Sequence, residues 1–283
     1  MSNAILLLCC PDQRGLVAAV ADFVLGHGGN VVHAEQHVDH QAGIFFQRVE
    51  FDLDGADLAH AQVAAAFAPV AERFQMDVAV RFSDERPRIA ILVSRQAHCL
   101  TDLLGRWRAG ELAAQIVTVI SNHPDHRDLV EFYGLPFHHL PVNPDSKPEQ
   151  ERRIVEILAA ADVELVVLAR YMQVLSSVVL DAYPLRIINI HHSFLPAFVG
   201  ARPYHQAQQR GVKLIGATAH YATADLDEGP IIAQDVAPVT HRDSVAEMIR
   251  TGRDLETVVL ARAVRAHVEH RTLAYGNKTI VFG

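Results

Sequence analysis

The sequence predicts an α/β chain with an N-terminal ferredoxin-like βαββαβ unit, followed by a doubly wound, mostly parallel α/β unit. Strand-like and helix-period segments follow one another in the order βαββαβ over residues 1–83. A polar, proline-ended segment at residues 84–87 has no apolar periodicity and is expected to be a linker. Over residues 88–283, short apolar runs alternate with helical segments, which is typical of a parallel sheet covered by helices on both faces.

The boundaries of the N-terminal elements are marked by residues that end strands and helices. Pro11-Asp12 ends the first apolar run, and Gly28-Gly29-Asn30 tolerates positive φ and ends the first helix. The polar loop at residues 39–43 lies between two β-rich runs and predicts a hairpin, and Pro69 can kink the second helix. The expected elements are strands at residues 5–10, 31–38, 44–51 and 77–82, and helices at residues 14–26 and 57–74.

In the second unit, residues 165–169 are apolar on both faces, as a central parallel strand should be. In doubly wound sheets, ligands bind beyond the carboxyl ends of the strands, so the residues that follow the strands are the candidates for function. The expected elements are strands at residues 89–93, 115–120, 165–169, 187–190 and 216–221, and helices at residues 100–108, 125–133, 149–160 and 244–267.

The composition narrows the range of partners. The net charge of −8 and the interspersed charges offer no basic stripe for a nucleic acid. No apolar run reaches the length of a membrane span, and no charged leader precedes the first strand, so a cytoplasmic location is expected. Cys9, Cys10 and Cys99 are too few for a disulfide framework or a paired zinc motif. The 17 histidines include no metal-binding motif, so no metal is expected.

Two polar segments follow strands of the second unit. Asn189 and His191 lie two positions apart at the end of one strand, where both can face the same side. Such a pair suits carbonyl transfer, because an amide donor can bind the developing oxyanion while an imidazolium stabilises it or protonates the leaving nitrogen. Asp227 lies in an acidic turn after the strand at residues 216–221 and could orient His191 or accept a proton from water. Each feature alone is equally compatible with a cap, a loop or a turn.

Together, the two segments resemble the signatures of the folate-dependent formyltransferase family. INIHHSFLPAFVGARPYHQA and IGATAHYATADLDEGPII match them over most of their length, and the resemblance extends from Arg88 to the C-terminus. It implies that Asn189, His191 and Asp227 are catalytic and that His220 supports them. The residues after the strand at 165–169 resemble the pterin cleft of the family, although a methionine and two aliphatic residues also suit a core. The expected substrate-binding residues are Arg170, Tyr171, Met172, Val174, Leu175, Gly200, His220 and Thr223.

The acceptor of the formyl group requires a separate argument. In the glycinamide ribonucleotide transformylases of this family, a loop rich in Gly, Ser and Asn after the first strand holds the acceptor's phosphate. The corresponding residues 94–100 contain no glycine, although Arg95 and His98 could bind an anion. The branch that acts on transfer RNA carries a further C-terminal domain, and the few residues after the last expected helix disfavour that branch. The resemblance therefore favours a hydrolytic branch that cleaves 10-formyltetrahydrofolate to formate and tetrahydrofolate without a cofactor, supplying one-carbon and purine metabolism. The alternatives are formyl transfer to an amine and a non-catalytic folate or amino-acid sensor.

In that hydrolytic branch, a small regulatory unit precedes the catalytic one, and the βαββαβ order resembles an ACT module. The resemblance implies an amino-acid effector at Asp12, Gly15 and Asn30. The alternative is that these residues only cap and end a helix. ACT modules commonly pair edge to edge, so a homodimer or homotetramer is expected, with a small-molecule folate substrate and no nucleic-acid or membrane partner.

Overall fold

A computed structural model describes residues 2–54, 56–143, 145–196 and 203–283. It contains two compact units. One runs to Glu85 and also includes Glu269–Leu273 and Ile280–Gly283, and the other comprises Arg86–Val268 and Ala274–Thr279. The division after Glu85 falls within the segment expected to be a linker. The C-terminal residues differ from the sequence-based assignment to the second unit. They join the first because Arg48 donates to the His270 carbonyl at 3.0 Å and the Gly283 amide donates to Glu35 at 2.7 Å.

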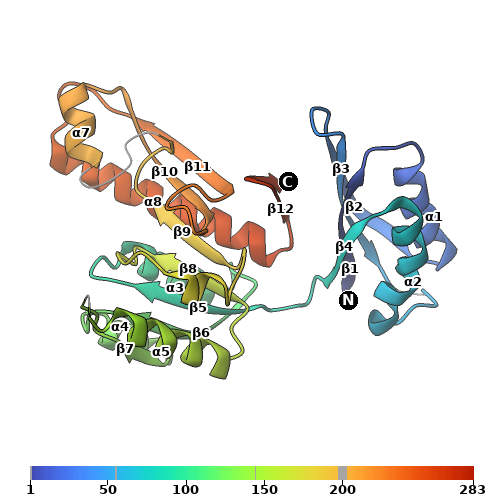
Figure 1. Ribbon diagram of the computed structural model, residues 1–283, viewed down its shortest axis with the longest axis horizontal. Coiled ribbons are helices and arrows are strands. Elements are labelled where there is room, and N and C mark those ends of the chain that lie inside the picture. Colours follow the sequence, from blue (N-terminus) through green and yellow to red (C-terminus); the bar gives the residue numbers. More distant parts are fainter. Residues whose placement is uncertain (1, 55, 144, 197–202) are drawn as a thin grey trace. The chain divides into compact units, whose positions relative to one another are not determined.

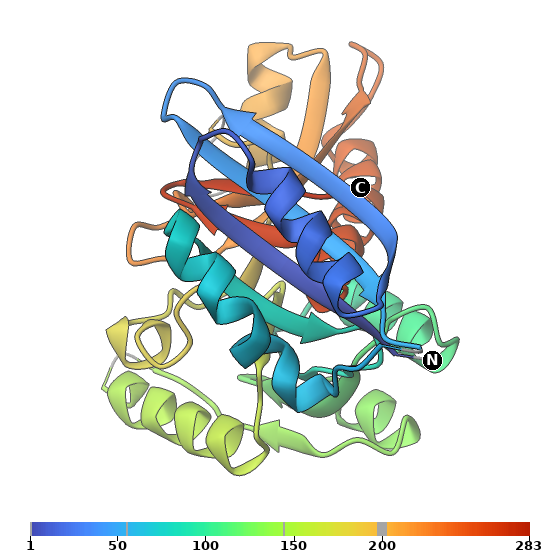
Figure 2. The same cartoon turned by 90° about the vertical axis from the view of Figure 1, so that its right-hand side faces the viewer.

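The first unit is a four-stranded antiparallel sheet of order β2-β3-β1-β4, with both helices on one face (Figures 1 and 2). The predicted βαββαβ order is therefore confirmed. Alternate residues of β1, including Leu6 and Leu8, pack with Phe23 of the first helix and Phe67 of the second. The second helix continues through Pro69. The elements are β1 (Asn3–Pro11), α1 (Leu16–Gly26), β2 (Asn30–Asp39), β3 (Ile44–Asp52), α2 (His60–Phe74) and β4 (Asp77–Phe82).

The second unit is built on a seven-stranded sheet of order β11-β10-β9-β8-β5-β6-β7, and the strands from β9 to β7 are parallel. Every residue of β8 is buried, which confirms its predicted central position. Its strands are β5 (Arg88–Val93), β6 (Gln115–Ser121), β7 (Phe137–His139), β8 (Leu165–Ala169), β9 (Ile187–His191), β10 (Leu214–Tyr221) and β11 (Ile231–Pro238).

Helices cover both faces of this sheet, as the alternating pattern predicts. Ile91 of β5 packs with α3 and α8, whereas its neighbour Leu92 packs with α5 and α6 on the opposite face. The helices are α3 (His98–Arg108), α4 (Arg127–Phe132), α5 (Lys147–Ala160), α6 (Ser177–Leu180), α7 (Pro203–Arg210) and α8 (Val245–Val268). Within the described part of the chain, none of the helices combines the length and the apolar character needed to cross a membrane.

One edge of the large sheet is antiparallel. β10 runs opposite to both β9 and β11, and β11 was not expected as a strand from the sequence. β7 was also not predicted, because its three residues are too short for a period to be visible. A separate two-stranded sheet consists of β12 (Thr272–Tyr275) and β13 (Lys278–Val281).

Candidate active site

β9 carries two polar side chains of the candidate site, Asn189 and His191. Ile188 and Ile190 pack into the core formed with α3 and α8, so Asn189 and His191 point to the opposite face. The parallel register places Asn189 beside Leu168 of β8. Both polar residues therefore lie at the carboxyl end of the central strands, where the doubly wound topology predicts a ligand site.

β10 adds a histidine through its antiparallel register, which places His220 opposite Asn189. Asn189 Nδ2 lies 3.2 Å from His220 Nε2, and His220 Nδ1 lies 3.0 Å from the Tyr221 carbonyl. Because a carbonyl only accepts, Nδ1 carries a hydrogen, and in that tautomer Nε2 can accept from the amide. The second hydrogen of the Asn189 amide then remains for a ligand.

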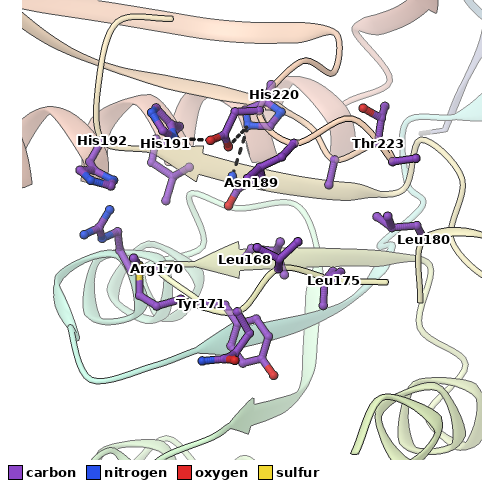
Figure 3. A pocket seen from close by; sticks show the side chains of 18 residues that line it. Leu168, Arg170, Tyr171, Leu175, Leu180, Asn189, His191, His192, His220 and Thr223 are labelled. Atoms are coloured by element: carbon purple, nitrogen blue, oxygen red, sulfur yellow. Dashed lines mark hydrogen bonds and ion pairs between the residues drawn. The ribbon is translucent and has the colours of Figure 1, made fainter. Parts of the chain in front are cut away.

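Asp227 joins these residues from the turn between β10 and β11. Its Oδ2 lies 3.1 Å from His191 Nδ1, and its Oδ1 lies 3.6 Å from His220 Nε2 (Figure 3). Polar contacts with His191 and then with His220 hold the pKa of Asp227 well below its usual range, so the carboxylate is ionised. His191 Nε2 is buried without a hydrogen-bond partner among the described residues, which is the condition of an atom that awaits a ligand.

The turn that carries Asp227 depends on its local sequence. Asp227 has a φ of 59°, in the left-handed region that Asp tolerates better than most residues. A Cβ at Gly229 would lie 1.8 Å from the Tyr221 carbonyl oxygen, so a larger residue does not fit there. The turn can therefore fold back over β10 closely enough for Asp227 to reach both histidines.

These residues line a cavity of about 440 Å³ whose remaining wall is largely apolar. Met172 and Val174 are each 56% exposed, which is unusual for apolar side chains and suits the mouth of a ligand site. The predicted residues Arg170, Tyr171, Met172, Val174, Leu175, His220 and Thr223 all line the cavity, together with Asn189, His191 and Asp227. Gly200 lies outside the described residues.

The roles of the lining residues differ. Tyr171 is buried, and its hydroxyl accepts a hydrogen bond from Gln150 at 3.0 Å. Burial raises the pKa of Tyr171 to about 12, so this residue supports the wall and does not titrate near neutral pH. Sequence reasoning missed several lining residues, which are Leu168, Gln173, Leu180, Ile190, His192, Ala222, Ala224 and Leu226. Leu168 could have been found, because it lies near the carboxyl end of the strand that leads into the predicted cleft segment.

One grouping among the described residues offers metal-type ligands, namely His98, Cys99 and Glu256, whose ligand atoms lie within 4.8 Å of one another. His98 Nε2 already lies 2.7 Å from Glu256. Burial raises the pKa of the Cys99 thiol well above its usual range, which keeps the thiol protonated. His98 and Glu256 therefore form a hydrogen-bonded pair, with the protonated Cys99 thiol close to them.

The effector candidates lie in the first unit. Gly15 has a φ of 93° and precedes α1, and the Asp12 amide donates to the Gly43 carbonyl at 2.8 Å. The register aligns Asn30 with Asp52 and Asn3, whereas Pro11 aligns with Ile44 at the other end of the sheet. Asp12 and Asn30 therefore lie at opposite ends of one sheet and do not form a single site within one chain.

Comparison with known proteins agrees with this geometry. Residues 87–264 match the Formyl transferase family model, and residues 4–67 match the ACT domain model. A formyltetrahydrofolate deformylase from Synechocystis is 53% identical over 99% of this chain and 98% of its own length. The chain belongs to the formyltetrahydrofolate deformylase family. Membership confirms the resemblance drawn from the two signature segments and from the order of the N-terminal unit.

Solved structures distinguish two kinds of relative within this fold. The crystal structure of a formyltetrahydrofolate deformylase from Pseudomonas syringae has a TM-score of 0.98 at 47% identity and covers 100% of this chain and 95% of that one. Glycinamide ribonucleotide transformylase 1 from Symbiobacterium toebii has a TM-score of 0.66 at 33% identity, covering 70% of this chain and 95% of that one. Relatives named for hydrolysis thus match both units of the chain, and this relative named for transfer matches a smaller part.

Proposed function

We propose that this chain hydrolyses 10-formyltetrahydrofolate to formate and tetrahydrofolate, and so supplies formate and free folate to one-carbon and purine metabolism. The observation that carries the proposal is the contact of His191 with ionised Asp227 beside the Asn189–His220 pair, at the wall of an apolar cavity. The full-length match to proteins named formyltetrahydrofolate deformylase supports water as the acceptor. A glycinamide ribonucleotide transformylase-like transfer is the alternative.

The proposed mechanism begins with a water molecule held by Asp227 and aimed at the formyl carbon. Attack converts the formyl oxygen into an oxyanion, which accepts hydrogen bonds from the Asn189 amide and from Nε2–H of protonated His191. The C–N10 bond then breaks, and N10 takes the proton from His191. The proton lost by the water passes to Asp227, whose 3.1 Å contact with His191 allows the proton to return to the ring. No metal or cofactor takes part in these steps.

The experiment that tests this function uses purified protein with 10-formyltetrahydrofolate and no added amine. Formate and tetrahydrofolate should appear in equal amounts. Tetrahydrofolate that forms only after an amine is supplied would refute hydrolysis and favour a transferase.

We also propose that the first unit binds an amino acid between two copies of the chain, in a cytoplasmic homodimer or homotetramer. β2 is an edge strand with exposed Val31 and Val32, and an edge strand can pair with a strand of a second chain. Antiparallel pairing of two β2 strands would bring Asn30 of one copy toward the Asp12 end of the other. A chain that remains monomeric by light scattering, with or without amino acids, would contradict this proposal.

A further inference from the structure

The cavity has two chemically different ends. Figure 3 shows Arg170 and His192 together at one end, while Leu175 and Leu180 lie at the other. The apolar end has the character of a wall for the ring system of a folate. The proposed mechanism gives no role to the polar end, although charged side chains concentrate there.

Behind the polar end lies a buried cluster that we name the Glu256 cluster, which comprises His98, Arg170, His192, Tyr204 and Glu256. Glu256 Oε2 lies 2.7 Å from His98 Nε2 and 3.3 Å from Arg170 Nε, and Oε1 accepts from the Tyr204 hydroxyl at 3.2 Å. The ring centroids of His192 and Tyr204 are 6.3 Å apart. Only 1% of Glu256 is exposed. The polar end is therefore backed by side chains of five separate segments that surround a buried carboxylate.

The charges of the cluster are satisfied internally. Burial opposes ionisation of Glu256, but the hydrogen bond from His98 and the charge of Arg170 outweigh it and lower the pKa of this carboxyl. Burial, followed by the charge of Arg170, lowers the pKa of His192 to about 4, so its ring is neutral near pH 7. A carboxylate already bound by His98 and Arg170 has little capacity left to hold a charged acceptor.

The cluster is also held firmly in place. The Ser94 amide donates to the Arg170 carbonyl at 3.3 Å, and the Met172 amide donates to Ser94 Oγ at 2.9 Å, which joins the loop after β5 to the loop after β8. On α8, a Cβ at Gly252 would lie 1.9 Å from the Tyr204 hydroxyl, so the tyrosine fills the notch that this glycine leaves. The side chains at the polar end therefore have little room to move aside for a bulky molecule.

Resting on the hydrolysis proposed above, we propose that the Glu256 cluster determines the acceptor, because it closes the polar end of the cavity to amines and leaves room for water alone. The fold itself does not make this choice, since a relative named glycinamide ribonucleotide transformylase shares it at 33% identity. If the cluster were opened, an amine nitrogen could attack the formyl carbon in place of water. The C–N10 bond would break, N10 would gain the proton that the amine loses, and the products would be a formylated amine and tetrahydrofolate.

The test measures how the formyl group divides between water and glycinamide, a primary amine considerably larger than water. His192→Ala removes a side chain that lines the cavity, and His98→Ala removes one that backs it. The matched control is His138→Ala on β7, a residue of the same unit that does not line this cavity. In wild type and control, formate should equal tetrahydrofolate at every glycinamide concentration. In at least one of the opened variants, N-formylglycinamide should form at a ratio to formate about tenfold or more above the detection limit that wild type sets, tenfold being the scale on which a missing side-chain group changes discrimination.

An unchanged ratio in variants that still form tetrahydrofolate would overturn the proposal. If His192→Ala forms no tetrahydrofolate, His98→Ala decides, because the substituted residue does not contact the cavity. Loss of tetrahydrofolate formation in both variants would also overturn it, since the cluster would then be needed for hydrolysis itself. Failure of wild type to release formate without an amine would instead refute the proposed hydrolysis, so the two failures are distinguishable.

Discussion

The substitution Asn189→Ala tests the proposed oxyanion site most directly. The Asn189 amide has two hydrogens; one is directed to His220 Nε2 at 3.2 Å, and the other is proposed to bind the oxyanion. Loss of one oxyanion donor typically costs about 2.7–4 kcal/mol of transition-state stabilisation. The expected fall in kcat is therefore about 10²-fold to 10³-fold. Affinity for tetrahydrofolate should change little, because this product lacks the formyl group and the apolar wall of the cavity remains intact.

The same substitution also removes the hydrogen bond to His220, whose net contribution to stability is about 1 kcal/mol. The stability effect is thus smaller than the catalytic one, and the two can be separated by urea unfolding and steady-state kinetics on the same preparations. Asn122→Ala is a matched control, because Asn122 is also buried and bonded through its amide group, to Ser94 at 2.7 Å, but does not line the cavity. It should lose stability while retaining most of its kcat.

The proposed oxyanion role of Asn189 is refuted if Asn189→Ala lowers kcat less than about tenfold while Asn122→Ala behaves as expected. A large rise in the Kd of tetrahydrofolate would refute it in another way. That result would show that Asn189 binds the folate itself and not the charge that develops on the formyl oxygen.

Three further outcomes are expected. Asp227→Asn should lower kcat by about 10²-fold to 10⁴-fold in a formate assay, and a normal rate would remove Asp227 from acid–base chemistry. The pKa of His192 is lowered in the folded protein to about 4, so the stability that its neutral form contributes is present above its ordinary pKa and is lost as pH falls toward 4. Between the ordinary pKa of histidine and about 4, the free energy of unfolding measured in urea should depend less on pH in His192→Gln than in wild type. An equal dependence on pH in the two proteins would contradict the argument that burial lowers the pKa of His192. Gly229→Ala should cost about 1–3 kcal/mol and reduce turnover, because its Cβ would meet the Tyr221 carbonyl; Gly105→Ala, with open space around it, is the control for both measurements.

The features that could be predicted from the sequence are those with a local signal. The apolar run of β8 and the breakers Gly28 and Gly29 indicated the elements of both units. Asn189 and His191 could be placed on one face from their spacing alone, because successive side chains alternate along a strand. Their contact with Asp227 was expected from the family resemblance, and the antiparallel turn of β10 into β11 provides its physical basis.

The features that could not be predicted depend on contacts between distant residues. Glu256 lies on a long helix whose pattern suggests a solvated charge, and its partner His98 is 158 positions away in the sequence. The packing of α3 against α8, together with Arg170 and Tyr204, makes this carboxylate a buried centre. The residues Glu269–Leu273 join the first unit without any periodicity to mark them, because a few backbone and side-chain hydrogen bonds decide their place.

The residues of the candidate site are positioned in two ways, by strand register and by a turn. Asn189, His191 and His220 are fixed by strand register, since directly opposed residues of an antiparallel pair keep their Cβ atoms about 4.5–5.5 Å apart. Asp227 alone arrives on a turn, with a positive φ and a return path that depends on Gly229. A shift of this turn would change the electrostatic surroundings of both histidines at once while leaving the strands in place. The proposed oxyanion donors are therefore positioned by the sheet, whereas the carboxylate proposed to activate water is positioned by a turn whose path depends on Gly229.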